Sequence, residues 1–298
     1  MRVNPNQLPN MLSALQQSET TLNTALQQVS TGKSVTQPSD NPAASASMVQ
    51  NTIDLANVDQ YTQNANDVLS MVQTADSALG SVVTSLTQAV SLGTSGANGT
   101  NNSSNLQAIA TQVQGILDSV VKQANSSYEG QYLFGGTATS QVPYTADSAS
   151  STGYTYNGNS DLNSVIVGDK TSVQMNLPGN QVFSDPSNSV IGSLSSLVSA
   201  LKGGDSATIA SATTAVNSAL NHVGQQRVFY ANAETQLNAQ EAYLSSEKVQ
   251  LTSQQTSLVG VDTAQAATTL ARAEAANSAA LAAVAKVLPN SLLNYLPN

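Results

Sequence analysis

The chain has 298 residues, of which only 9% are charged, and 18 acidic against 9 basic residues give a formal net charge of −9. The basic residues are scattered singly from Arg2 to Lys286, which excludes the cationic patch that contact with a nucleic-acid backbone requires. Cysteine is absent and His222 is the only histidine, so disulfides, thiolate zinc sites and cysteine nucleophiles are excluded.

The sequence predicts no transmembrane helix, because it has no run of about 18 apolar residues. The start, MRVNPNQLP, lacks the apolar stretch of a cleaved secretory signal peptide. We therefore expect that, if the protein leaves the cell, it uses a route that does not read such a peptide.

A heptad repeat opens the chain. Apolar residues recur every seven positions at Leu8, Leu15, Leu22 and Val29, and Leu12 and Leu26 lie on the interleaved line with Glu19. This spacing predicts about three heptads of coiled coil over 8–29. We expect Gly32 to end this helix, and Asn41 to cap a second helix that starts at Pro42.

Two much longer helices are predicted further along the chain. One covers 42–92, where apolar residues alternate at spacings of three and four, and the other covers 205–258, where they stand seven apart from Ile209 to Leu258. Each would be about 75–80 Å long. Shorter helices are predicted over 106–124, with an end near Gly130, and over 190–201. An alanine-rich helix is predicted over 264–288, with Pro289 as its end.

The pattern changes between 131 and 186, where half of the aromatic residues gather. Val165-Ile166-Val167 is a β-branched run, residues 173–177 alternate between apolar and polar, and Asn157-Gly158 and Pro178-Gly179 are turn dipeptides. We interpret this segment as a small β-rich domain.

The fold class that follows is mainly α with a β-rich insert. An amphipathic helix cannot bury its own apolar stripe, so we expect the first helix to pair with the last and the second with the second-to-last, antiparallel. The result would be an elongated rod with a terminal coiled coil and a β domain at the tip. The predicted domains are 1–41 with 261–298, 42–130 with 188–260, and 131–187.

Few residues suggest chemistry. STGKS at 30–34 resembles the end of a phosphate-binding loop, but Gln27 stands where that motif needs glycine and a helix precedes it. Glu234 and Glu241 are a heptad apart and are interpreted as charges flanking the stripe. The β-rich segment carries five ionisable residues with no spacing typical of a catalytic site, namely Asp147, Asp161, Asp169, Lys170 and Asp185. No catalytic, cofactor-binding or metal-binding residue is predicted.

The last helix leaves two roles open, at a membrane surface or against a partner helix. It carries only Arg272 and Lys286 as basic residues and no large aromatic residue, which favours the partner helix. The apolar residues beyond Pro289, in the segment 292–296, would be exposed in a monomer.

Several segments carry a resemblance to a known family. They are MRV at the start, VSTGK at 29–33, PSDNPA at 38–43, GQYLFGG at 130–136 and SLLNYL at 291–296. Together, and in this order, they resemble the bacterial flagellin family, in particular its members at the junction between the flagellar hook and filament. The resemblance covers about the first 135 and the last 90 residues.

The resemblance implies a structural protein without cofactor, exported unfolded through the flagellar type III apparatus to the extracellular flagellum. It implies a ring of copies of the chain between hook-associated protein 1 and flagellin, and a cytoplasmic export chaperone that holds the C-terminal region. By this match, the subunit interface comprises Leu8, Leu12, Leu15, Leu22, Leu26, Leu281, Val284, Leu288, Leu292 and Leu293.

Three functional hypotheses follow. The leading one is a structural adaptor that joins hook to filament, and the alternative is a flagellin, the filament subunit itself. The third is an exported enzyme with a site in the β-rich segment, around 144–183. We also predict that the terminal helices are mobile in a dilute monomer, since about three heptads of coiled coil are marginal alone.

Overall fold

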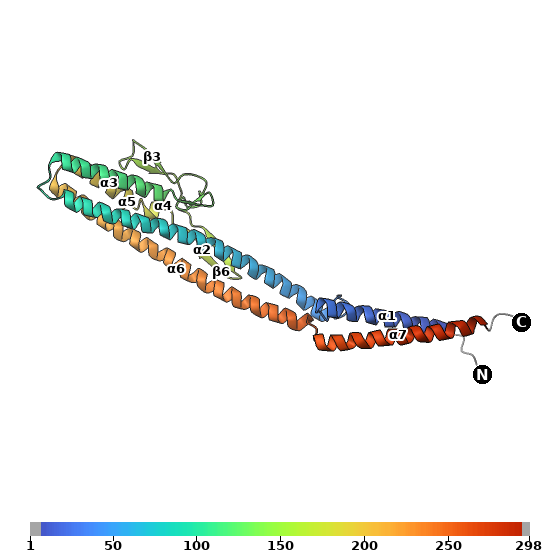
Figure 1. Cartoon of the computed structure of the whole chain (residues 1–298). Helices are drawn as coiled ribbons and strands as arrows, with labels where there is room; N and C mark the ends of the chain where they lie inside the picture. Colours follow the sequence, from blue (N-terminus) through green and yellow to red (C-terminus); the bar gives the residue numbers. More distant parts are fainter. Residues whose placement is uncertain (1–6, 294–298) are drawn as a thin grey trace. The chain divides into compact units, whose positions relative to one another are not determined.

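The computed structural model describes the backbone of residues 7–293 and the side chains of residues 9–286. It confirms a mainly α-helical chain with small antiparallel sheets (Figure 1). The long helices are α1 (Gln7–Thr31), α2 (Pro42–Gly96), α3 (Ser103–Ala124), α5 (Val190–Gly203), α6 (Ser206–Val259) and α7 (Thr263–Leu293). The chain divides into two compact units, which are 1–57 with 247–298 (the terminal unit) and 58–246 (the central unit). Both divisions fall inside the long helices α2 and α6.

The strands form three separate two-stranded antiparallel sheets, all in the central unit. They are β1 (Ser127–Tyr128) with β2 (Gln131–Tyr132), β3 (Tyr144–Ala146) with β4 (Tyr154–Tyr156), and β5 (Ser164–Gly168) with β6 (Thr171–Gln174). A single helical turn, α4 (Gly179–Val182), follows them. The predicted β-rich segment is therefore three hairpins rather than one continuous sheet.

Helix ends follow capping chemistry. The Asn41 side chain accepts a hydrogen bond from the Ala44 amide at 3.0 Å, so the predicted cap at the start of α2 is confirmed. Asn102 caps α3 in the same way, and Gly204 ends α5 in the left-handed conformation at φ 79°. Gly32 ends α1 at φ 67°, as expected from its position.

Three predicted helix ends were wrong. α2 continues past Leu92 to Gly96, and α7 continues through Pro289, which removes only the one hydrogen bond that a proline cannot donate. α3 ends at Ala124 rather than near Gly130. Asn125, the residue after the helix, exchanges two side-chain hydrogen bonds of 2.8 Å with the backbone of Tyr144, and this pairing with a later segment draws the chain out of the helix.

The core of the central unit is continuous and apolar. α3 and α5 pack against each other, and completely buried side chains from α2 and α6 face them. The largest buried side chains of this core are Leu79, Leu86, Leu133, Phe134, Phe183, Ile191, Leu194, Leu197, Leu201, Ile209, Tyr230 and Leu237. Burial on this scale is the main source of the unit's stability.

α2 and α6 run antiparallel within each unit. In the terminal unit the Asn51 amide donates to the Leu251 carbonyl at 3.1 Å. In the central unit Arg227 forms a bidentate ion pair with Asp76, at 2.8 and 2.7 Å, and this hydrogen-bonded pairing raises the pKa of Arg227. Asp76 interrupts the apolar line of α2, and the ion pair accounts for that interruption.

Candidate assembly surface of the terminal helices

In the terminal unit α1 and α7 lie side by side and antiparallel (Figure 1). Their contact is lined by small residues, of which Ala25, Ala266 and Ala273 are buried. Larger side chains at the same contact are only half-buried, among them Leu15, Leu22, Leu270 and Val284. Alanine at such positions lets two helices approach closely, but it buries little apolar area.

The predicted stripe on α1 holds for Leu15 and Leu22, whereas Val29 of the same line is exposed and the interleaved line was wrong. Leu15 and Leu22 face α7, but the interleaved line consists of Met11, Ser18 and Ala25 rather than Leu12, Glu19 and Leu26. Both lines fit a heptad, because positions three and four residues away from the first line are equally consistent with the repeat. Because Met11, Ser18 and Ala25 occupy the contact with α7, Leu12 and Leu26 face away from it.

The outward leucines are the exposed apolar residues of these helices. Leu12 is 56% exposed, Leu26 44% and Leu281 50%, and Val29 is also exposed. Of the predicted interface residues, these three leucines are free to meet another chain, whereas Leu15, Leu22 and Val284 are partly used inside the molecule. The side chains of Leu8, Leu288, Leu292 and Leu293 lie outside the described residues.

A second exposed apolar group in the terminal unit was missed by the sequence analysis. Val49 and Ile53 are 61% and 49% exposed on α2, and Val249 is 68% exposed on α6. The signal was present in the sequence, because Val49 and Ile53 are four residues apart and therefore share one helix face. They lie off the apolar line of α2 from which its pairing with α6 was predicted.

The two linkers of the terminal unit are tied together by backbone hydrogen bonds. The Ser34 amide donates to the Val259 carbonyl at 2.7 Å, and the Val261 amide donates to the Gly32 carbonyl at 3.1 Å, on either side of a β-bridge between Lys33 and Gly260. The pairing holds the ends of α1 and α7 together. It also shows that STGKS forms a helix end and a bridge, not a phosphate-binding loop.

Asp40 anchors the first of these linkers. Its carboxylate accepts hydrogen bonds from the Gln37 amide at 2.9 Å and from the Thr36 amide and hydroxyl at 3.0 and 3.1 Å. These bonds, that of Gln37 foremost, favour the charged form and lower the pKa of Asp40. Asp40 therefore stabilises the turn that precedes α2.

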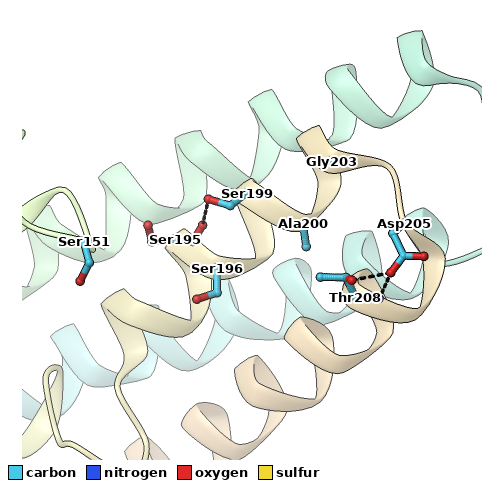
Figure 2. Close-up of a pocket in the computed structure, with 8 residues that line it drawn as sticks. All are labelled: Ser151, Ser195, Ser196, Ser199, Ala200, Gly203, Asp205 and Thr208. Atoms are coloured by element: carbon cyan, nitrogen blue, oxygen red, sulfur yellow. Dashed lines mark hydrogen bonds between the residues drawn. The ribbon is translucent and has the colours of Figure 1, made fainter.

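Hydroxyl groups dominate one pocket of the central unit (Figure 2), which has a volume of about 380 Å³. The Ser199 hydroxyl donates to the Ser195 carbonyl at 3.0 Å and not to a base. Asp205 accepts hydrogen bonds from the hydroxyl and the amide of Thr208, which lower the pKa of Asp205 and cap α6. This arrangement supplies no nucleophile–base pair.

The ionisable residues of the β-rich segment do not gather at one place either. Asp147 accepts hydrogen bonds from the Thr155 hydroxyl and the Ala149 amide, which lower the pKa of Asp147, and Asp185 accepts from two amides of its own turn. His222 contacts the Gln181 carbonyl at 2.9 Å. Within residues 7–293 no cluster of three or more His, Asp or Glu residues could hold a metal ion. No helix in this range is long and apolar enough to cross a membrane.

Comparison with known proteins shows a likeness over the N-terminal part of the chain. Residues 3–139 match the bacterial flagellin N-terminal helical region. The chain is 34% identical over 119 residues to flagellar hook-associated protein 3 of Salmonella typhimurium, a match that covers 40% of this chain and 38% of that protein. Over its N-terminal part the chain is therefore similar to the bacterial flagellin family.

Two further known proteins show how far the likeness extends. A phase 1 flagellin of Salmonella naestved is 28% identical over 113 residues, covering 38% of this chain and 22% of the flagellin. The crystal structure of the flagellar junction protein FlgL from Legionella pneumophila covers 72% of this chain and 99% of that one, with a TM-score of 0.60 and 14% identity. That structure supports the fold, whereas the sequence matches span about two fifths or less of the curated relatives' length.

Proposed function

We propose that the chain is a structural subunit of the bacterial flagellum that joins the hook to the flagellin filament. The observation that carries this proposal is the set of outward leucines on α1 and α7, Leu12, Leu26 and Leu281, beside a seam that is already closed by small residues. Apolar side chains grouped on a helix pair are typical of a surface that another chain covers. The likeness to flagellar hook-associated protein 3 supports the same position.

The proposed partners are hook-associated protein 1 on the hook side, flagellin on the filament side, and further copies of this chain in a ring. Val49, Ile53 and Val249 are further exposed apolar residues of the terminal unit that such neighbours would cover. Export through the flagellar type III apparatus, with a cytoplasmic chaperone holding the C-terminal region, would bring the subunit to the extracellular flagellum. The role is structural, in keeping with a family of structural flagellar proteins.

The test is deletion of the gene followed by complementation. Deletion is expected to leave hooks without filaments and flagellin in the medium, and the wild-type gene should restore filaments. The variant Leu12→Ser/Leu26→Ser should be exported but fail to restore them, whereas Gln16→Ser/Gln27→Ser, at exposed polar positions of the same helix, should restore them. Normal filaments on the deletion strain would refute the proposal.

The alternative, a flagellin, is supported by the matches to curated flagellins. It predicts that the purified protein elongates filament seeds over many subunit lengths, whereas a junction subunit stops after adding a short layer. Electron microscopy of seeded reactions separates the two.

A further inference from the structure

The central unit contains a cavity that the proposed function does not use. Its volume is about 230 Å³, and it lies where α2 meets the β1–β2 hairpin and the β5–β6 hairpin. The Asn64 side chain fixes this junction, because it donates to the Ile166 carbonyl at 2.9 Å. The cavity is therefore built between elements that are held in place.

The floor of the cavity is apolar. Val68, Met71 and Leu133 are buried there, and Val165 and Met175 complete the wall as half-buried side chains. Two of these five are methionines, whose flexible thioethers adapt to the shape of an inserted group.

The rim of the cavity is negatively charged. Asp67 and Glu129 line it and are exposed, and the lining contains no Lys or Arg. Among the residues that the structure describes, neither carboxylate forms an ion pair. A group with an apolar stem and a cationic end would match this floor and this rim.

Glu129 has a backbone conformation that is unfavourable for a glutamate. It has φ 50°, followed by Gly130 at φ 80°, as in a two-residue turn of the hairpin between β1 and β2. Asn, Asp or Gly adopts this conformation more readily than Glu does. Glu129 is the one non-glycine residue with positive φ in the described part of the chain, and it is also a carboxylate that lines a cavity.

We propose that this cavity is a socket for one Lys or Arg side chain of a neighbouring protein chain. The aliphatic stem of that side chain would lie on Met71 and Met175, and its charge would lie between Asp67 and Glu129. The volume is below the roughly 300–1,000 Å³ of small-molecule sites, and it suits a single side chain. The proposal adds a contact on the central unit and does not depend on the hook–filament assignment.

The experiment uses the absence of cysteine from the chain. In Gln131→Cys the thiol stands on the cavity lining, and in the control Ser91→Cys it stands at an exposed position of α2. Each full-length protein is equilibrated in thiol buffer with four disulfide probes, made from cysteamine, 2-guanidinoethanethiol, propanethiol and 2-mercaptoethanesulfonate. Intact-mass spectrometry then gives the labelled fraction.

The measured quantity is the ratio of protein labelled by a cationic probe to protein labelled by propanethiol. We expect this ratio to be on the order of fivefold higher at position 131 than at position 91, because Asp67 and Glu129 would each form an ion pair with the cationic probe. Comparing cysteamine with 2-guanidinoethanethiol distinguishes lysine from arginine as the occupant. Asp67→Asn/Glu129→Gln in the Gln131→Cys background should remove the preference, and circular dichroism checks that this variant is folded. An equal preference at both positions, a preference that survives the double substitution, or a preference for the neutral or anionic probe would overturn the proposal.

Discussion

Asn51 is the buried polar residue of the α2–α6 pair in the terminal unit, and replacing it with leucine tests how that pair is held. The side chain is 3% exposed. Its amide nitrogen donates to the Leu251 carbonyl at 3.1 Å and, at 3.5 Å, to the side-chain oxygen of the exposed Gln254, which water can replace. Its oxygen Oδ1 is buried without a hydrogen-bond partner. A buried polar residue in a helix pair costs stability but fixes which residues face each other.

The expected effect of Asn51→Leu is stabilisation. Removing the unpaired Oδ1 recovers about 1–3 kcal/mol, and losing the bond to Leu251 costs about 0.5–1.5 kcal/mol. The Leu251 carbonyl still accepts its bond within α6, so no new unsatisfied group arises. Adding the apolar contact of the new side chain, we expect a net gain of about 1–2 kcal/mol in the local unfolding free energy of the pair.

Hydrogen exchange of residues 44–57 and 247–259 measures that local free energy. Protection factors should rise about tenfold, which corresponds to about 1.4 kcal/mol. The matched control is Asn57→Leu, an exposed asparagine of the same helix and unit, which should change protection little. A fall in protection for Asn51→Leu, or an equal rise for the control, would refute the argument.

Three further predictions follow. Leu86→Ala should destabilise the central unit by about 2–5 kcal/mol in urea unfolding because Leu86 is completely buried, whereas Leu162→Ala at a 54% exposed position should change it by less than about 0.5 kcal/mol. Folding lowers the pKa values of Asp40, Asp147 and Asp205, so these carboxylates stabilise the folded chain above pH 3.8 and lose that effect as the pH falls through their folded pKa values. The urea midpoint should therefore drop in this acidic range, and it should drop less steeply in the triple Asp→Asn variant. Amides of α1 should exchange rapidly in a dilute monomer, because its seam with α7 buries mainly small side chains; strong protection there would contradict the prediction.

Regular features of the chain could be predicted from the sequence because each has a local cause. The breaks at Gly32 and Pro42 follow from backbone conformation and capping, and the long helices follow from apolar periodicity. Asp76 is visible in the sequence as a polar residue on the apolar line of α2. Its pairing with Arg227 is not, because 151 residues separate the two in the chain.

The features that were missed depend on contacts between distant segments. The end of α3 is set by the pairing of Asn125 with Tyr144, and the inner face of α1 is set by the alanines of α7. The predicted stripe was built from large apolar residues, whereas the buried position on the inner line of α1 is an alanine, Ala25. The cavity beside Glu129 likewise requires two hairpins and a helix to meet.

The choice of small residues for the seam has a consequence for assembly. If leucines had filled the seam, α1 and α7 would bury most of their apolar area within one molecule and leave little for a neighbour. Because Ala25, Ala266 and Ala273 take the buried positions and the larger side chains of the seam stay half-buried, the helices pair closely while Leu12, Leu26 and Leu281 remain exposed. The free energy of burying these leucines is then gained only when another chain covers them, so ordering of the terminal helices and assembly become linked equilibria. Under the proposed function, a helix pair that gains stability only from its neighbours would suit a subunit that is exported before it assembles.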